Sequence, residues 1–342
     1  MTTETSHAEV APPVEGARKP ARGNVMPDDG FVSQVTTPSG VEIRFATEPK
    51  RKYEVRKPLG TLEMDIHQRM SKWKEVPSVT AALEVLDKPA LPWWGMKTGI
   101  EALTYLVETG LLIVGFDGQK HGFMRPGGTE FLGPYVNEQG ESKNSLVDLV
   151  NEYKLTVNHV KNKAGDRGTS VHNFLEAWGA LGTMPDVDSV PWEDKGYVTG
   201  LKHFLQDAVG LVGEAMEVTV ASVKHGYAGR FDLLAKTTQD MRVVTKIYPK
   251  NAPKWTIVPA GKRLLIDLKT SKDIYPNHLL QLEAYEGGLV ECGYGATDAR
   301  AVLHVCADGR YEFRQAKGQL KDYVAVLRAD AALKRTKEAL KV

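Results

Sequence analysis

The amino-acid sequence predicts an α/β fold in which one mixed β-sheet is flanked by helices. Beyond Asn162, segments with helical spacing of apolar residues alternate with short apolar runs typical of strands, in the order αβββαβ. Glycine-containing turn signals separate several runs, as at Lys224-His225-Gly226 and Asp308-Gly309. The chain has 342 residues, of which 42% are hydrophobic, enough for one large domain with additions or for two modest domains.

We expect three regions along the chain. Residues 1–30 combine Ala, Pro, Gly, Glu and Arg without apolar periodicity, which predicts a mobile leader. Residues 31–160 are expected to form a hairpin followed by a largely helical N-terminal region. Residues 161–342 are expected to hold the α/β core and a C-terminal helix.

Within residues 31–160, apolar residues on both sides of Pro38-Ser39-Gly40 predict a hairpin. Ser78 is a suitable N-cap for a helix, and a second helical stretch opens at Pro92 and runs to Val107. A glycine-rich loop near residues 115–133 follows. The adjacent Trp93 and Trp94 can stack on nucleobases, although such a pair more often belongs to a hydrophobic core.

The elements of the core region follow from the same periodicities. The first helix is expected to begin near Gly168, opened by Thr169 or Ser170, and to end near Leu181. The remaining expected elements are helices at 198–209, 277–292 and from 318, strands at 215–223, 227–235, 263–270 and 300–306, and an inserted hairpin at 241–258.

The segment Leu264–Ser271 carries the clearest chemical signal. Residues i and i+2 of a strand project from the same face, so Asp267 and Lys269 should stand side by side at the end of a buried strand. A carboxylate can bind Mg²⁺, and an ammonium can stabilise charge that develops on a phosphate. A salt bridge on an exposed edge strand is the alternative, which the preceding apolar run disfavours.

A second carboxylate, Asp232, follows the turn Gly226-Tyr227-Ala228-Gly229 and lies early in an apolar strand. Glu217 lies on the strand before it. Ahead of both, His172 lies on the predicted helix, where no second histidine stands at the spacing of a zinc motif.

Gln281 and Tyr285 are four residues apart on the helix that follows the lysine strand. They therefore share a helix face, from which they can hydrogen-bond phosphate or orient Lys269.

Taken in order, these motifs resemble the RecB-like branch of the PD-(D/E)xK nuclease superfamily, close to its phage-encoded and CRISPR-associated exonucleases. The resemblance covers roughly Gly165 to Cys306 and implies a restriction-endonuclease-like core. It implies a metal site formed by His172, Asp232 and Asp267, with Glu217 in support, and it assigns catalytic roles to Asp232, Asp267, Lys269, Gln281 and Tyr285.

The chain departs from that family in two respects. The spacing between Asp232 and Asp267 is long, consistent with the inserted hairpin. Many relatives bind an iron–sulfur cluster through four cysteines, whereas this chain has only Cys292 and Cys306. We therefore expect Mg²⁺ or Mn²⁺ and no iron–sulfur cluster.

The resemblance favours a metal-dependent exonuclease that acts on DNA ends or single strands in phage-type recombination, repair or replication. A structure-selective endonuclease and a non-cleaving DNA-binding module on the same fold are the alternatives. Candidate DNA contacts are the basic residues Lys161, Lys163, Arg167 and Arg230, for which a solvated surface is the other interpretation. A recombination partner protein or a second copy of the chain is a further candidate partner.

The composition excludes several classes of protein and limits where a DNA-binding surface can lie. Lys and Arg number 44 against 43 Asp and Glu, so any phosphate-binding surface must come from local clustering. Two cysteines cannot form the disulfide framework of a small secreted protein. The sequence has no apolar run of the ~20 residues that a membrane span needs and no apolar leader. We expect a cytoplasmic location, the host cytoplasm if the protein is phage-encoded, and no membrane association.

Overall fold

The computed structural model describes residues 33–46, 52–58, 70–86, 90–116, 121–247 and 252–340. The chain divides into two compact units: the core unit, which combines the residues up to Leu86 with Gly168–Val342, and the inserted unit, Asp87–Arg167. This division differs from the expected boundary at residue 160, because the described residues between 33 and 86 fold with the core. The leader expected in residues 1–30 lies outside the described residues.

A five-stranded mixed sheet forms the centre of the core unit, with the strand order β15-β14-β13-β10-β9. Its strands are β9 (Leu211–Ser222), β10 (Tyr227–Thr237), β13 (Arg263–Lys269), β14 (Ala299–Val305) and β15 (Tyr311–Gln315). Strands β9, β10 and β13 are antiparallel neighbours. Strand β14 runs parallel to β13, to which helix α6 (Pro276–Glu291) connects it. The predicted mixed sheet flanked by helices is thereby confirmed.

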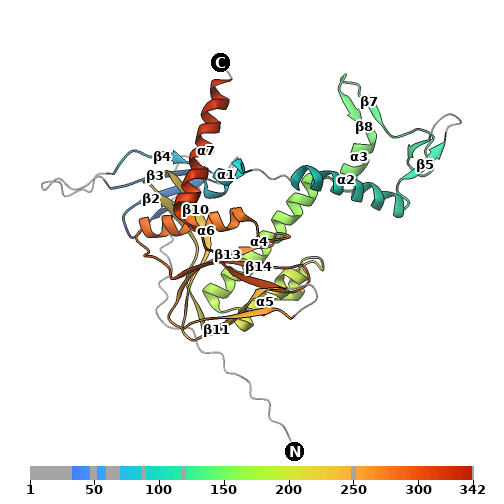
Figure 1. Cartoon of the computed structure of the whole chain (residues 1–342). Coiled ribbons are helices and arrows are strands. Elements are labelled where there is room, and N and C mark those ends of the chain that lie inside the picture. The colour runs from blue at the N-terminus through green and yellow to red at the C-terminus, as the bar shows by residue number, and fades with distance from the viewer. Residues whose placement is uncertain are drawn as a thin grey trace, which may run out of the picture. The chain divides into compact units, whose positions relative to one another are not determined.

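Each face of this sheet packs into its own hydrophobic cluster. On one face, Leu265 of β13 packs with Leu282 and Leu289 of α6. On the other face, Ile266 packs with Leu175 of α4 (Val157–Leu181), and α5 (Lys195–Asp207) belongs to the same cluster. Figure 1 shows α6 and α5 on opposite sides of β13 and β14. Because side chains alternate along a strand, Asp267 and Lys269 project on the α6 side with Leu265.

Four short strands extend the core on the α6 side. They are β1 (Ser33–Thr36), β2 (Glu42–Ala46), β3 (Lys52–Arg56) and β4 (Lys74–Val76), and they form an antiparallel sheet in chain order. Their buried residues, including Ile43 and Val55, belong to the same cluster as Leu282. The predicted hairpin at Pro38-Ser39-Gly40 is confirmed, with Gly40 at the positive φ of 77° that suits glycine.

Three further elements complete the core unit. Helix α1 (Val79–Ala82) begins at the predicted cap Ser78, whose Oγ accepts a hydrogen bond from the Ala81 amide at 3.1 Å, and continues as the 3₁₀ helix η1 (Leu83–Val85). The inserted hairpin is confirmed as β11 (Met241–Lys246) and β12 (Lys254–Val258). The 3₁₀ helix η2 (Val187–Ser189) precedes α5, and helix α7 (Leu320–Ala339) contacts α6.

Helix α4 is longer than predicted, because it begins at Val157 rather than near Gly168. Thr169 and Ser170 therefore lie inside the helix and do not cap it. The helix runs through Gly165 and Gly168, because isolated glycines are tolerated within a helix at a cost of ~1 kcal/mol each.

The inserted unit is less helical than the sequence suggested. Its elements are α2 (Ala90–Glu108), β5 (Ile113–Phe116), β6 (His121–Met124), β7 (Pro134–Val136), β8 (Ser142–Asn144), α3 (Ser145–Glu152) and the beginning of α4. Two β-hairpins thus stand between α2 and α3, and Gly140, with φ of 78°, allows the turn between β7 and β8. The fully buried residues of this unit's cluster are Leu106, Leu112 and Leu149. No helix among the described residues of either unit is long and apolar enough to cross a membrane.

Candidate active site

Three carboxylates lie in a row across neighbouring strands of the central sheet. Leu233 of β10 stands opposite Met216 of β9 and Ile266 of β13. Both pairings are antiparallel, so Asp232, one residue before Leu233 on β10, falls between Glu217 and Asp267. The strand register therefore brings together three acids that are separated by up to 50 positions in the sequence.

His172 reaches this row from helix α4. Its Nδ1 lies 3.2 Å from Oδ1 of Asp232 and 3.6 Å from Oε1 of Glu217. One ligand atom from each of these three residues lies within 4.8 Å of the other two. This spacing suits a single cation held by an imidazole nitrogen and two carboxylate oxygens.

Glu217 occupies a strained backbone position within β9. Its φ of 50° lies in the left-handed region, which non-glycine residues seldom adopt, and strands normally exclude it. Strain of this kind costs about 1–3 kcal/mol and is found most often where function requires it. The side chain is held by Arg230, whose Nε lies 2.7 Å from Oε2 of Glu217.

Asp232 is buried and held from two sides. Its Oδ2 accepts a hydrogen bond from the backbone amide of Leu268 at 2.6 Å, while Oδ1 faces His172. Burial raises the pKa of this carboxyl, but the charges of His172 and Lys269 and the Leu268 hydrogen bond outweigh burial and lower the pKa overall. Asp232 is therefore held as a carboxylate.

Asp267 and Lys269 form a buried ion pair, as their i, i+2 spacing predicted. Lys269 Nζ lies 2.5 Å from Oδ2 of Asp267, whose side chain is 1% exposed. Burial raises the pKa of Asp267 to about 6, with Lys269 opposing and Asp232 adding to the shift. Burial lowers the pKa of Lys269, but Asp267 and Asp232 outweigh it and raise the pKa overall. Lys269 is therefore held in its protonated form.

His172 is a cation in this arrangement. Burial lowers its pKa, but Asp232 and Glu217 outweigh burial and raise it to about 10. An imidazolium thus balances the carboxylates in the metal-free protein. A divalent ion at the same carboxylates would need the neutral imidazole, so proton and metal compete for this site.

Gln281 and Tyr285 line up on α6 as predicted, but each binds the other. Gln281 Nε2 donates to the Tyr285 hydroxyl at 2.6 Å, and both side chains are buried. Burial raises the pKa of Tyr285, and the charge of Asp267 adds to this shift, which places the phenol within the electrostatic reach of the carboxylate row. The Gln281–Tyr285 pair therefore forms part of the buried α6 surface near Asp267.

The predicted basic residues do not form one group. Arg230 belongs to the core unit and is ion-paired with Glu217. Lys161, Lys163 and Arg167 belong to the inserted unit, where Lys161 and Lys163 are exposed on α4. Of the four, Arg230 is the one that the core unit brings to the carboxylates.

Two histidines near Lys269 were not expected from the sequence. His304 pairs with Lys269 across β13 and β14, and its Nε2 lies 2.7 Å from the Ser271 carbonyl oxygen. His278 is buried on α6, where burial and the charge of Lys269 lower its pKa to about 3. The proximity of His304 depends on the parallel pairing of β13 and β14, and that of His278 on the packing of α6, neither of which sequence spacing reveals.

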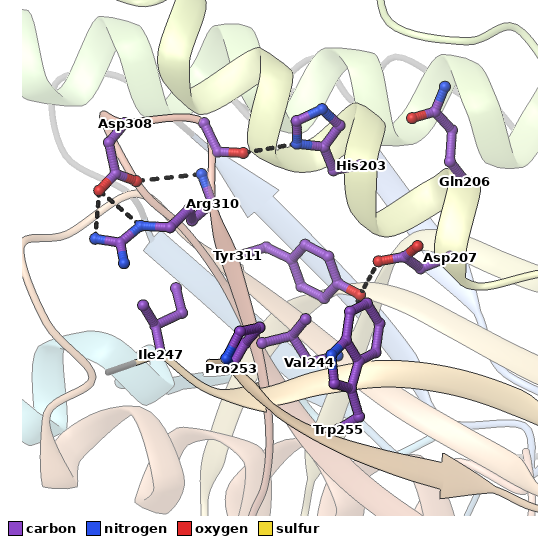
Figure 2. Close-up of a pocket in the computed structure, with 11 residues that line it drawn as sticks. His203, Gln206, Asp207, Val244, Ile247, Pro253, Trp255, Asp308, Arg310 and Tyr311 are labelled. Atoms are coloured by element: carbon purple, nitrogen blue, oxygen red, sulfur yellow. Dashed lines mark hydrogen bonds and ion pairs between the residues drawn. The ribbon is translucent and has the colours of Figure 1, made fainter. Parts of the chain in front are cut away.

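A pocket of about 360 Å³ lies apart from these residues, between α5, the β11–β12 hairpin and the β14–β15 turn (Figure 2). Its carboxylates already have partners, because Asp207 accepts from the Tyr311 hydroxyl at 2.6 Å and Asp308 pairs with Arg310. None of the predicted catalytic residues is among those that line it. The carboxylate row, rather than this pocket, is the candidate active site.

Comparisons with known proteins add little to this geometry. No family model matches the chain. No curated protein matches it. Among solved structures, the crystal structure of SSO0001 is similar at 15% sequence identity, covering 48% of this chain and 74% of that chain with a TM-score of 0.25. This likeness identifies neither a family nor an activity, so the functional argument rests on the site itself.

Proposed function

We propose that the chain is a metal-dependent deoxyribonuclease that hydrolyses phosphodiester bonds. The observation that carries this proposal is the convergence of His172, Glu217 and Asp232 on one point, next to the Asp267–Lys269 pair. A structural salt bridge would account for Asp267 and Lys269 alone. It would not account for three further ionisable groups, one of them on a strained backbone.

The donor set fits Mg²⁺ or Mn²⁺. Carboxylate oxygens suit both ions, and the imidazole of His172 favours Mn²⁺. His172, Glu217 and Asp232, whose ligand atoms lie together, would hold the ion. Asp267, which the resemblance named as a ligand, is not part of that group and would act beside it with Lys269. When bound, such an ion lowers the pKa of a coordinated water and offsets negative charge on phosphate.

Lys269 supplies the fixed positive charge of the site. Its ammonium is held by Asp267 and stays protonated, so it can stabilise the charge that develops on the phosphate oxygens during hydrolysis. Asp232 stays ionised, and the hydrogen bond between Gln281 and Tyr285 holds these two side chains of α6 in place next to the pair.

The sequence resemblance favours an exonuclease on DNA ends or single strands, in recombination, repair or replication. We place this activity in the cytoplasm, where the two free cysteines remain thiols.

Cleavage of end-labelled linear, circular and flap DNA with Mn²⁺, and with EDTA instead, tests the proposal. We expect metal-dependent loss of label from linear DNA. Cleavage of circular or flap DNA would favour a structure-selective endonuclease, and metal-independent binding without cleavage would favour a binding module.

The role of Lys269 needs a separate comparison of rate and affinity. Lys269→Ala should lower the single-turnover rate by about 10²–10³-fold, as for a lost charge-stabilising donor, with little change in DNA affinity measured in Ca²⁺. Lys269→Arg should not restore the rate, because a guanidinium cannot replace a compact ammonium. Lys236→Ala, at an exposed position near the end of β10, is the matched control. Equal losses of rate and affinity would make Lys269 a simple phosphate contact.

A further inference from the structure

The two carboxylates that face His172 each have one oxygen directed toward the imidazole and the other held by a donor. In Asp232, Oδ1 faces His172, while Oδ2 accepts the hydrogen bond from the Leu268 amide at 2.6 Å. In Glu217, Oε1 faces His172, while Oε2 lies 2.7 Å from Nε of Arg230. Each acid therefore offers a single oxygen atom on the side of the imidazole.

Arg230 reaches Glu217 diagonally across two strands. It stands opposite Thr219 in the antiparallel pairing of β10 with β9, two residues from the place of Glu217 on β9. The side chain of Arg230 is 38% exposed and that of Glu217 is 18% exposed. Because a guanidinium does not lose its proton in proteins, Oε2 of Glu217 lies against a permanent cation. A metal ion that approached Oε2 would be repelled by this charge.

The number of carboxylate oxygens on offer matters because divalent cations differ in what they need. Ca²⁺ takes about six to eight oxygen ligands and often binds both oxygens of one carboxylate, whereas Mg²⁺ keeps several waters and needs fewer protein ligands. Mn²⁺ also accepts an octahedral ligand set. His172, Glu217 and Asp232 supply one ligand atom each. Such a set leaves Ca²⁺ with few protein oxygens.

We propose that Arg230 determines the metal preference of this site. By holding Oε2 of Glu217, it prevents that carboxylate from binding an ion through both oxygens, and it thereby disfavours Ca²⁺ relative to Mn²⁺. Arg230 acts through Glu217 and is a positioning residue, not a ligand and not primarily a DNA contact. This role rests on the metal site of the proposed function.

Calorimetric titration of the full chain with Mn²⁺ and with Ca²⁺, in the absence of DNA, tests this role. The wild-type protein should bind Mn²⁺ more tightly than Ca²⁺. Arg230→Met keeps the length of the side chain but removes its charge and its donors. It should lower the ratio of the Ca²⁺ to the Mn²⁺ dissociation constant by about tenfold or more, as for other groups that hold metal ligands. Both ions carry the same charge, so the attraction gained by removing a cation cancels in this ratio.

A second ion pair on β9 provides the matched control. Nε of Arg263 lies 2.6 Å from Oε2 of Glu214, which is outside the group around His172. Arg263→Met should therefore leave the ratio of dissociation constants unchanged. Arg230→Lys keeps a cation beside Oε2 of Glu217 and should retain the wild-type ratio. Circular dichroism and thermal unfolding in EDTA check that each variant is folded.

A double variant shows whether Arg230 acts through Glu217. Glu217→Gln leaves a side-chain amide, which has one oxygen and cannot bind an ion through two. In that background, Arg230→Met should produce no further change in the ratio, because the two residues act on one interaction. A further change as large as that in the single variant would overturn the assignment.

An unchanged ratio in folded Arg230→Met would also overturn the proposal. If DNA affinity fell in that variant regardless of sequence, Arg230 would be a phosphate contact instead. A wild-type protein that bound both ions equally would refute the role of Arg230 but not the nuclease proposal. A wild-type protein that bound neither ion would refute the metal site, and this role with it. Because the readout is metal binding and not cleavage, the two failures are distinguishable.

Discussion

At the residue scale, Asp232 has structural partners as well as a proposed role in metal binding. It accepts the Leu268 amide hydrogen bond and faces the His172 imidazolium, both in a buried setting. Removing the carboxylate therefore leaves a buried N–H group without a partner, which costs about 1–3 kcal/mol. An asparagine at the same position can keep the oxygen that accepts from the Leu268 amide, but it replaces the oxygen facing His172 with an uncharged NH₂ group.

We predict that Asp232→Ala and Asp232→Asn both abolish metal-dependent cleavage but differ in stability. Asp232→Ala should lower the free energy of unfolding by at least about 1 kcal/mol more than Asp232→Asn does, because of the unpaired Leu268 amide. Chemical denaturation in EDTA, alongside cleavage assays, measures the two effects. Wild-type cleavage rates in the asparagine variant would remove Asp232 from the metal site.

His172 gives the metal-free protein a defined pH dependence. Its pKa is raised in the folded state from the ordinary 6.5 to about 10. A raised pKa contributes stability that is complete below pH 6.5 and is lost as the pH rises toward 10. The pKa of Asp267 is also raised, to about 6. Its titration therefore changes the free energy of unfolding below pH 7 and not between pH 7 and pH 10.

We therefore predict that the free energy of unfolding in EDTA falls between pH 7 and pH 9, by up to about 1.4 kcal/mol per pH unit for one proton. His172→Gln should flatten this slope, whereas His203→Gln, in the pocket of Figure 2, should leave it unchanged. Added Mn²⁺ should reverse the slope, because the ion binds the neutral imidazole and proton loss then favours binding. Equal slopes in wild type and His172→Gln would contradict the assigned cause.

At the element scale, the close approach of β10 and α6 depends on Gly229. A Cβ there would stand 2.7 Å from Cε1 of Tyr285 and 2.9 Å from Cγ2 of Val79. The absence of a side chain thus allows Tyr285 to lie against the strand that carries Asp232.

Gly229→Ala should accordingly displace Tyr285 and lower the free energy of unfolding by about 1–3 kcal/mol, as overpacked cores do. Because Tyr285 and Gln281 form part of the buried α6 surface near Asp267, the cleavage rate should fall as well. Gly165→Ala is the control, since a Cβ there meets no atom within 4 Å and alanine favours a helix. Thermal unfolding and single-turnover cleavage of both variants check this; a Gly229→Ala protein as stable and active as wild type would refute it.

Individual helices and strands show which structural features could be predicted from the sequence and which could not. Strand β13 was predictable because its apolar run is buried on both faces, and the pairing of Asp267 with Lys269 followed from strand geometry. The start of α4 was misplaced because Thr169 and Ser170 were interpreted as caps, whereas the helix begins at Val157 and includes both residues. The alignment of Glu217 with Asp232 depends on register between two strands, and its positive φ has no signature in the sequence.

At the scale of the whole molecule, the sequence predicted the mixed sheet but not the unit boundaries. Periodicity reports local structure, whereas β1–β4 and α1 belong to the core unit through long-range packing, which places Ile43 in the same cluster as Leu282.

The two units differ in how much apolar surface they bury, and this difference predicts two unfolding transitions. The core unit has two extensive clusters, one on each face of the five-stranded sheet, while the inserted unit has a single small one. Stability scales with the apolar area removed from water, so the inserted unit should unfold first in differential scanning calorimetry of the full chain.

Matched cavity variants assign the transitions. Leu106→Ala, at a fully buried position of the inserted unit, should cost about 2–5 kcal/mol and lower the first transition by roughly 8 °C or more. Leu282→Ala, equally buried in the core unit, should lower the second transition and leave the first in place. If both variants instead shifted one common transition, the units would unfold as a single cooperative body.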